Sequence, residues 1–354
     1  MAFKKLNILL LFSSSDIGGA ERSLTRMALK NSNPSISYQL ATFGSSGPLS
    51  KWIKSKSIKC YCFNYKTILL IKYLYLYKPD VIYIIGFRLS IFLRFFCKIF
   101  IKKIILIQGV RWNPNTNSKL DMTFRFIERL FSFLLDGYIA NSDVSGRLIS
   151  SIVRNNVEVI HNGISIHPIK KTSYPERNYI LTLANLSNRK GHKEYIKAIA
   201  KVVKKIPSSQ FLFLGNDNLN GQIQKLIEKE RLTSNIKYLG FHEDIQIFLQ
   251  QSSIFVLPSL YGEGCPTSIL EAFSCSLPVI AYRIDGIPEL VSHDSDGILV
   301  DIDGDYKLED AIESLLMDPM RSIEMGKKGY IKVKENFLLE NMLNKHNVFF
   351  QGLS

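Results

Sequence analysis

The sequence predicts an α/β protein built from two doubly wound, Rossmann-like domains. Three observations support this fold class. Short apolar segments alternate with amphipathic helical segments, the alternation occurs twice, and a stretch rich in turn-forming residues separates the two runs. The chain has 354 residues, which is long for one hydrophobic core and sufficient for two. Strict alternation of strand and helix predicts a parallel sheet covered by helices on both faces, once in each half.

The first half contains six segments with the apolar pattern of buried strands. They span residues 7–12, 38–42, 81–85, 103–107, 137–140 and 157–160. Amphipathic helices are predicted between them, including residues 21–30 and 123–135.

The second half repeats the alternation more regularly. Its six predicted strands span residues 179–184, 210–215, 236–240, 254–257, 277–281 and 297–300. The helices predicted between these strands include residues 193–205, 221–229 and 245–250. A final helix is expected over residues 308–336, broken near Pro319, and an amphipathic tail follows over residues 337–350.

The domain boundary is predicted near residues 162–171, which carry glycine and proline and little periodicity. This prediction gives an N-terminal domain of residues 1–168, a C-terminal domain of residues 169–335, and a last helix of residues 336–354 that crosses back to the N-terminal domain. Two doubly wound domains facing each other across a cleft are expected to bind ligands at the carboxyl ends of their strands.

The positive charge is concentrated in the first half. The formal net charge is +14, of which residues 1–168 carry +15 and the remainder carries −1. Such asymmetry predicts an anionic partner for the first half. Part of this charge lies on one predicted helix, where Arg94, Lys98 and Lys102 are spaced four residues apart among aromatic residues. This stripe predicts peripheral binding to an anionic membrane surface, although a solvated face of a core helix explains the spacing nearly as well.

The remaining composition indicates an intracellular globular protein. The five cysteines form no framework of metal ligands or disulfides and are expected to be reduced thiols. The apolar N-terminus lacks a small-residue cleavage site, so a first strand is favoured over a signal peptide, and every apolar run is interrupted by Arg or Lys. We therefore expect a cytoplasmic location on the inner face of the cell membrane.

Residues 253–290 hold the most informative pattern of the chain. A buried strand leads to a loop with Glu263, a helix opens near Pro266, Glu271 lies in its second turn, and another buried strand follows. The start of a helix presents backbone N–H groups and the positive end of the dipole to an anion. Two carboxylates suit hydroxyl groups rather than a bare phosphate. The ligand that fits both features is a nucleotide sugar.

This stretch resembles the E-x7-E motif of retaining glycosyltransferases of family 4, the group 1 glycosyl transferases with the GT-B fold. The resemblance covers residues 179–300 closely and residues 1–165 loosely. It implies an N-terminal acceptor-binding domain and a C-terminal domain that binds the nucleotide sugar. It also implies that Glu263 is catalytic, near the reacting carbon of the donor sugar, and that Glu271 binds the ribose hydroxyls.

The same resemblance implies further donor-binding residues. They are the glycines of the first strand–helix turn, a basic loop, two residues near the nucleotide base, and the loop before the E-x7-E helix: Gly18, Gly19, Asn185, Arg189, Lys190, Phe241, His242, Gly264, Cys265, Pro266 and Thr267. Lys190 matches the family's diphosphate-binding lysine, but Asn185 occupies the position of the usual arginine. Either Arg189 replaces that cation or the site is weaker.

The acceptor is expected on the N-terminal domain. Many relatives carry a histidine near the end of the strand predicted at residues 103–107, and this chain has none there, so Gln108 and Arg111 are the acceptor-side candidates. Relatives of this kind act in the synthesis of bacterial surface polysaccharides (O-antigen, capsule or lipopolysaccharide) on a lipid carrier. We expect a UDP-sugar donor and a hydroxyl of a lipid-linked glycan as acceptor.

No acidic cluster in the sequence predicts a metal site, so metal-independent transfer without a cofactor is expected, with the nucleotide sugar as substrate. Two other classes of protein remain open. A GT-B nucleotide-sugar epimerase would need acid–base residues at the sugar. A basic nucleic-acid-binding protein would not explain the pair of glutamates, and we expect no nucleic-acid partner.

Overall fold

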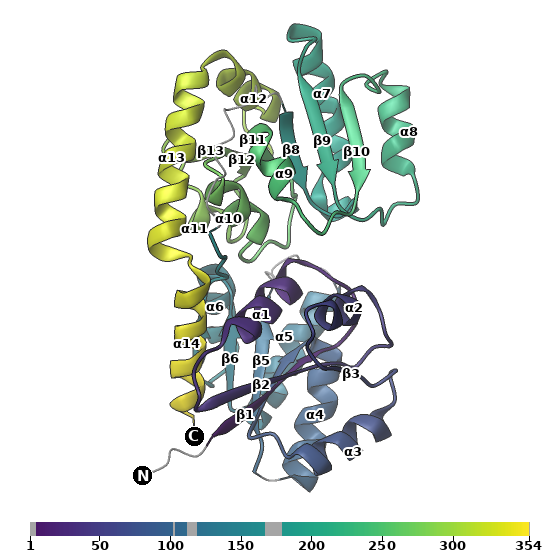
Figure 1. The fold of residues 1–354 in the computed structure, drawn as a ribbon, viewed down its shortest axis with the longest axis vertical. Coiled ribbons are helices and arrows are strands. Elements are labelled where there is room, and N and C mark those ends of the chain that lie inside the picture. The colour runs from purple at the N-terminus through teal and green to yellow at the C-terminus, as the bar shows by residue number, and fades with distance from the viewer. Residues whose placement is uncertain (1–4, 102, 112–118, 167–178, 354) are drawn as a thin grey trace. The chain divides into compact units, whose positions relative to one another are not determined.

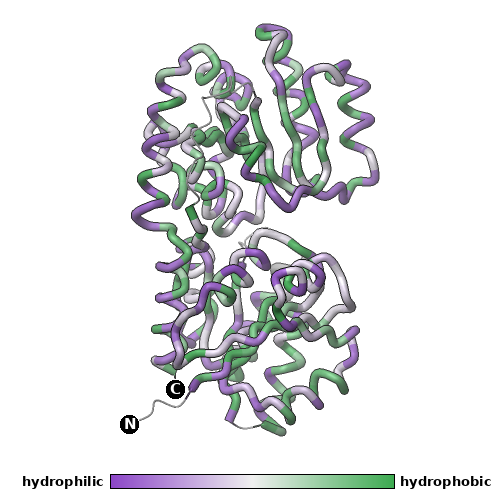
Figure 2. Tube along the Cα trace, in the orientation of Figure 1, coloured by the Kyte–Doolittle hydropathy of each residue, from purple (hydrophilic) through white to green (hydrophobic). Residues whose placement is uncertain are grey.

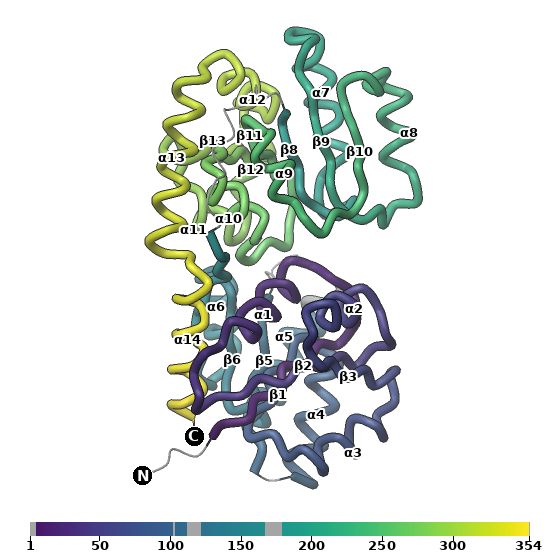
Figure 3. Tube along the Cα trace, viewed as in Figure 1, coloured from purple at the N-terminus to yellow at the C-terminus, as the bar shows by residue number. Residues whose placement is uncertain are grey.

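The computed structural model describes residues 5–101, 103–111, 119–166 and 179–353. The chain divides into two compact units: Met1–Gly163 with Leu339–Ser354 form the first, and Ile164–Leu338 form the second. Figure 3 follows the chain from the first unit into the second and back. The boundary expected between residues 168 and 169 lies outside the described residues, and the last helix returns to the first unit from Leu339 onward.

The first unit contains a seven-stranded parallel sheet in the order β3-β2-β1-β4-β5-β6-β7 (Figure 1). The strands are β1 (Leu6–Phe12), β2 (Ile36–Thr42), β3 (Cys60–Cys62), β4 (Val81–Ile85), β5 (Ile105–Val110), β6 (Gly137–Ala140) and β7 (Val157–Val159). The helices are α1 (Gly19–Lys30), α2 (Pro48–Ser55), α3 (Thr67–Tyr77), α4 (Phe87–Phe100), α5 (Lys119–Phe131), η1 (Ser132–Leu134), α6 (Asp143–Ser150) and α14 (Leu339–Gln351).

Alternate residues of the first sheet enter two separate buried clusters. Ile8 and Leu10 of β1 pack with α1, α2 and α14, whereas Leu9 and Leu11 pack with α3, α4, α5 and α6. Helix α14 therefore completes one of the two helical layers of the first unit, and the period-2 alternation of the strands fixes which side chains it meets.

The second unit contains a six-stranded parallel sheet in the order β10-β9-β8-β11-β12-β13. The strands are β8 (Tyr179–Leu183), β9 (Gln210–Leu214), β10 (Ile236–Gly240), β11 (Ser252–Leu257), β12 (Val279–Tyr282) and β13 (Gly297–Val300). The helices are η2 (Asn188–Lys190), α7 (His192–Lys205), α8 (Gln222–Lys229), α9 (Gln246–Gln250), α10 (Thr267–Ser274), α11 (Ile287–Leu290), α12 (Leu308–Met317) and α13 (Pro319–Asn336).

These topologies confirm the predicted fold class. In each sheet the strand order reverses between the first and fourth strands, β1 and β4 or β8 and β11, which is the switch point of a doubly wound fold. The strands are largely hydrophobic along their length (Figure 2) because both of their faces are covered. The predicted break at Pro319 is also confirmed, since Pro319 begins α13 directly after α12.

Candidate functional site

The basic loop of the second unit lies against the loop that holds Glu263. Gly191, at φ +64°, ends the short helix η2, and a Cβ atom there would lie 2.0 Å from the carbonyl oxygen of Pro258. Only glycine permits this close approach and this backbone conformation. As a result, the loop after β8 and the loop after β11 are held together, with Arg189 and Lys190 beside residues 260–263.

Glu263 is buried, and its carboxylate lies beside two cationic side chains. Its Oε1 forms an ion pair with the Lys190 ammonium and lies 3.5 Å from Nη1 of Arg189. The same Arg189 nitrogen donates to the carbonyl oxygen of Gly262 at 3.0 Å. The side chains of Lys190 and Arg189 are 14% and 40% exposed, so the cluster is open on its cationic side.

The cations keep Glu263 ionised. Burial works against ionisation of this carboxyl, but the Lys190 ammonium and the Arg189 guanidinium outweigh it, so the pKa of Glu263 lies below its usual range. Burial lowers the pKa of the Lys190 ammonium, and the Glu263 carboxylate opposes that shift. The site therefore presents a carboxylate acceptor and two donors with positive charge.

Asp285 holds the Glu263 loop in place and was not identified from the sequence. Its Oδ2 accepts hydrogen bonds from the backbone N–H groups of Gly262 at 2.5 Å and of Glu263 at 3.0 Å. The carbonyl oxygen of Glu263 also accepts from the N–H of Gly286 at 3.1 Å. Asp285 has φ +48°, a conformation that aspartate tolerates better than most residues. Asp285 begins the D-G-I-P-E-L segment that follows the second buried strand, but the sequence alone assigns it no role.

The start of α10 completes this part of the second unit. Pro266 is the N-cap residue, one position before the helix, and no side chain caps the first amides. Gly264 and Cys265 are buried in the preceding loop, and Thr267 is buried in the first turn. Glu271 is buried within the same helix. The start of a helix favours an anionic ligand, although the N–H of Ile269 in this first turn already donates to the carbonyl oxygen of Pro266 at 3.2 Å.

Three other predicted donor residues follow β8 and β10, the two strands that flank β9. Asn185 follows β8, and its Oδ1 accepts from the backbone N–H of Asn216 at 2.9 Å, so this oxygen is used in joining two loops. Phe241 is 45% exposed after β10. His242 packs edge-on against Phe248 at 4.7 Å between ring centroids. Arg189, rather than Asn185, supplies the second positive charge beside Lys190.

The predicted residues of the first unit occupy a different environment. Gly18 is the N-cap residue of α1 and Gly19 is its first residue. A Cβ atom on Gly18 would lie 2.8 Å from Oε2 of Glu21. Burial raises the pKa of the Glu21 carboxyl, although hydrogen bonds from the Glu21 and Gly18 backbone and the charge of Arg111 oppose the shift.

Arg111 joins β5 to the last helix. It donates to the hydroxyl of Tyr83 on β4, lies 3.2 Å from Oδ1 of Asn162, and is 3.4 Å from Nε2 of the fully buried His346 on α14. Gln108 is fully buried within β5, where its Nε2 donates to the carbonyl oxygen of Gly109 at 2.9 Å. Arg111 thus has a structural role in the first unit, and the acceptor-side assignment of both residues stays a prediction.

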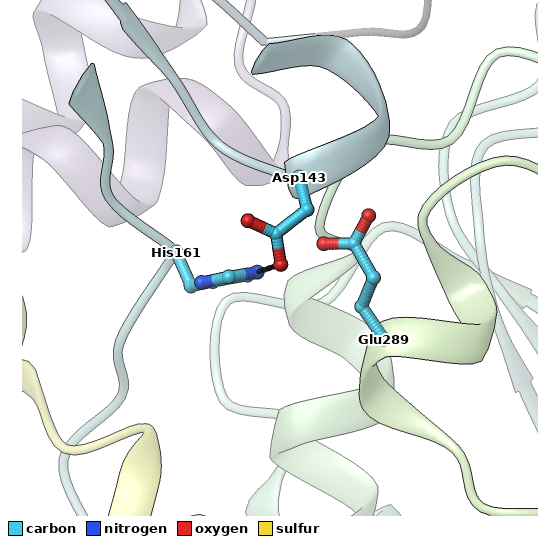
Figure 4. A group of neighbouring side chains, drawn as sticks. All are labelled: Asp143, His161 and Glu289. Carbon is cyan, nitrogen blue, oxygen red and sulfur yellow. Dashed lines mark ion pairs between the residues drawn. The ribbon is translucent and has the colours of Figure 1, made fainter. Parts of the chain in front are cut away.

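A histidine does lie near a strand end of the first unit, but on a different strand from the one considered. His161 follows β7, and its Nε2 is 3.8 Å from Oδ2 of Asp143, the first residue of α6 (Figure 4). No pattern in the sequence marks His161, which directly follows the strand expected to close the domain.

The prediction that Arg94, Lys98 and Lys102 form an exposed basic stripe for membrane binding is wrong. Arg94 is fully buried, and its Nη2 lies 2.6 Å from Oε1 of Glu128, which is equally buried. Lys98 pairs with Asp136 at 3.1 Å, and Lys102 lies outside the described residues. The helical spacing was correct, but it could not reveal an acidic partner on α5. No helix in the described part of the chain is long and apolar enough to span a membrane.

Two curated proteins are similar to part of the chain. The amylovoran biosynthesis glycosyltransferase AmsK of Erwinia amylovora is 32% identical over 127 residues, which is 34% of this chain and 31% of that protein. A GDP-mannose-dependent monoacylated alpha-(1-6)-phosphatidylinositol monomannoside mannosyltransferase of Corynebacterium glutamicum is 30% identical over 182 residues, 49% of this chain and 47% of that protein. The chain spans about half the length, or less, of the curated relatives it matches.

A solved structure extends the similarity of fold to nearly the whole chain. HepE of Anabaena, in complex with UDP and glucose, superposes with a TM-score of 0.83 at 20% identity and covers 98% of this chain and 100% of that chain. The fold is accordingly that of GT-B glycosyltransferases. Residues 164–332 match the family model of glycosyl transferases group 1. The matched residues all lie within the second unit.

Proposed function

We propose that this protein is a retaining glycosyltransferase. In this proposal it moves a sugar from a nucleotide-sugar donor, of the UDP-sugar type, to a hydroxyl of a lipid-linked glycan during synthesis of a bacterial surface polysaccharide. The observation that carries the proposal is the buried, ionised Glu263 with Lys190 and Arg189 beside it in a unit that matches the group 1 family model. UDP and glucose in the similar HepE support the donor class, and the amylovoran enzyme supports the polysaccharide setting.

The residues of the cluster have distinct roles in this proposal. Lys190 and Arg189 bind the diphosphate, whose developing negative charge is the main feature that such an enzyme must stabilise. Glu263 contacts the donor sugar near the reacting carbon, and Glu271 binds the ribose hydroxyls. Because the two cations also meet Glu263 in the free protein, they hold the carboxylate in place before the donor arrives. Asp285 positions Glu263 through the backbone of its loop.

The proposed reaction uses no separate general base and no metal ion. The leaving phosphate itself takes part in deprotonating the acceptor hydroxyl, and Lys190 with Arg189 provides the positive charge that a divalent ion would otherwise supply. Activity should therefore persist in excess chelator. Loss of activity in chelator that manganese restores would contradict this part of the proposal.

Calorimetric titration with UDP, GDP and ADP tests the donor site directly. One nucleoside diphosphate should bind, and Lys190→Ala should weaken its affinity about 10- to 100-fold, because a hydrogen bond to a charged group is lost. The matched control is Lys197→Ala, an exposed lysine of α7, which should bind as the original protein does. Absence of binding by all three nucleotides would refute the proposal. The nucleotide that binds then guides hydrolysis assays with its sugar conjugates.

A further inference from the structure

One helical layer of the first unit is unusually apolar on its outer side. Helices α3, α4 and α5 pack on the same face of the first sheet, where Leu74, Leu93 and Phe124 share one buried cluster. Twelve large apolar side chains on these helices and η1 are nevertheless exposed in the described residues. The most exposed include Ile68, Leu76, Ile99, Phe100, Phe126 and Phe133. Apolar stretches of α3 and α4 are visible in Figure 2.

The opposite layer lacks this feature. Among the described residues of α1, α2 and α14, Val348 is the one large apolar side chain with comparable exposure. Scattered apolar residues on a protein surface need no explanation, but their concentration on one layer indicates a surface that is covered by another body.

Two acidic residues in this layer are paired with cations of the same layer. Glu128 of α5 is fully buried with Arg94, and Asp136 is paired with Lys98. The sequences of α3 and α4 contain no aspartate or glutamate. Exposed basic side chains remain in and beside this layer, among them Arg129. The outer side therefore combines apolar surface with positive charge, the combination that suits an anionic bilayer.

A basic pocket lies at one end of this layer. It has a volume of about 920 Å³ and is bounded by α5, η1 and the segment after α6. Arg125, Arg129 and Arg154 line it together with Phe126 and Phe133, and none of the described lining residues is acidic. The segments that form the pocket directly precede β6 and β7. It therefore lies at the amino-terminal edge of the sheet, whereas Arg111 follows the carboxyl end of β5.

Stabilisation of helix ends does not account for these arginines. Cations near a helix C-terminus can compensate the exposed carbonyl groups. In this pocket the carbonyl oxygens of Ser132 and Leu135 already accept hydrogen bonds from Nδ2 of Asn155, at 3.1 and 2.7 Å. The side chains of Arg129 and Arg154 are exposed and form no ion pair within the described part of the chain.

We propose that the layer of α3, α4, α5 and η1 docks on an anionic lipid bilayer, with a lipid headgroup phosphate in the pocket of Arg125, Arg129 and Arg154. Phe126 and Phe133 enter the interfacial region beside the headgroup. The site is separate from the proposed transfer reaction because it occupies the other edge of the sheet. Unlike the predicted stripe of Arg94, which is buried, this surface is exposed and can reach a membrane.

Vesicle sedimentation with the full-length protein tests the charged part of the proposal. Binding should require phosphatidylglycerol in vesicles of phosphatidylcholine and should fall steeply with salt. The double variant Arg129→Gln/Arg154→Gln should lower the partition coefficient about 10- to 30-fold, since two basic groups are lost from the surface. The matched control is Lys225→Gln/Lys229→Gln, which removes two exposed lysines from α8 of the second unit. Equal binding to neutral and anionic vesicles, or equal loss in the control, would overturn the proposal.

A second pair of variants tests the apolar part. Phe126→Ser/Phe133→Ser should weaken the binding that survives high salt, and Met317→Ser/Met320→Ser, on exposed positions of the second unit, should not. Sedimentation velocity distinguishes docking on lipid from self-association of the protein. A change from dimer to monomer in the phenylalanine variant would assign the layer to a second copy of the chain and refute docking on lipid. Nucleotide affinity should be unchanged in all four variants, so failure of the donor-site proposal would be seen independently.

Discussion

Each unit buries an acidic residue beside a cation, but in different surroundings. In the first unit Arg94 and Glu128 are fully enclosed, and Tyr138 donates a further hydrogen bond to Glu128. In the second unit Glu263 is buried, whereas Arg189 remains 40% exposed beside it. The enclosed pair has no room for a ligand, and the open cluster does. The same pairing of charges therefore serves stability in one unit and a binding site in the other.

The enclosed pair should give the largest effect on stability. Glu128→Ala leaves the Arg94 charge buried without its partner, which we expect to cost about 3–5 kcal/mol of unfolding free energy. Tryptophan fluorescence during urea unfolding reports the first unit, because Trp52 and Trp112 both precede residue 163. As a control, Arg283→Ala disrupts the exposed pair with Asp301 and should leave the unfolding of the second unit unchanged, as followed by circular dichroism.

A double variant separates charge from packing at the same position. Arg94→Met/Glu128→Leu removes both charges and should recover much of the stability that Glu128→Ala loses, because neither replacement leaves a buried ion. If the double variant is as unstable as the single one, the hydrogen bonds of the pair, rather than its charges, hold α4 to α5.

In the cluster of Glu263, Lys190 and Arg189, loss of the carboxylate charge should affect turnover rather than stability. Glu263→Gln retains a hydrogen-bond acceptor for Lys190 but removes the negative charge, so turnover should fall roughly 10²- to 10³-fold while nucleotide affinity stays nearly constant. Steady-state rates and calorimetric titration of the same preparation measure the two quantities. Wild-type turnover in this variant would remove Glu263 from the reaction and weaken the contrast between the two clusters.

Glu271 should affect binding rather than turnover. Its replacement by alanine should weaken nucleoside diphosphate binding by about 1.5–3 kcal/mol through the loss of a charge-assisted hydrogen bond to ribose. Titration of the corresponding base without ribose provides the control, since its affinity should not change. Unchanged affinity for the nucleoside diphosphate would place Glu271 among the structural residues of α10.

The sequence predicted the regular parts of both units because buried parallel strands are continuous apolar runs. It missed β3 and the helices α2 and α3. The sequence of α3 is apolar on all sides, so it shows no helical period, and β3 spans only three residues. Strand β5 begins two residues later and ends three residues later than expected, at Ile105 and Val110, because its basic and polar neighbours hide its ends.

The candidate site was predictable only where a motif existed. The spacing of Glu263 and Glu271 and the basic loop identified one part of the second unit, and the structure places Lys190 and Arg189 against Glu263. Asp285 has no such pattern, since its role depends on a turn that returns it to the backbone of Gly262. Arg94 shows the converse limit: its spacing is regular, but only the fold reveals the partner 34 residues away.

Buried histidines in both units should make stability depend on pH. Burial and then the nearby Arg111 cation lower the pKa of His346 in the first unit to about 3, and burial and then Lys190 lower the pKa of His192 in the second unit to about 4. Both histidines are neutral when folded, whereas the unfolded chain takes up protons below pH ~6.5. Stability should therefore be unaffected above that pH and fall by up to about 1.4 kcal/mol per pH unit and histidine below it.

Replacing each histidine tests whether the units respond separately to acid. His346→Gln should flatten the pH dependence of tryptophan-monitored unfolding between pH ~6.5 and ~4, whatever its effect on absolute stability. His192→Gln should leave that dependence unchanged, because it lies in the second unit. His242→Gln, at a partly exposed position, is the common control. An equally steep acid limb in His346→Gln would mean that the buried histidine does not set the response of the first unit to acid.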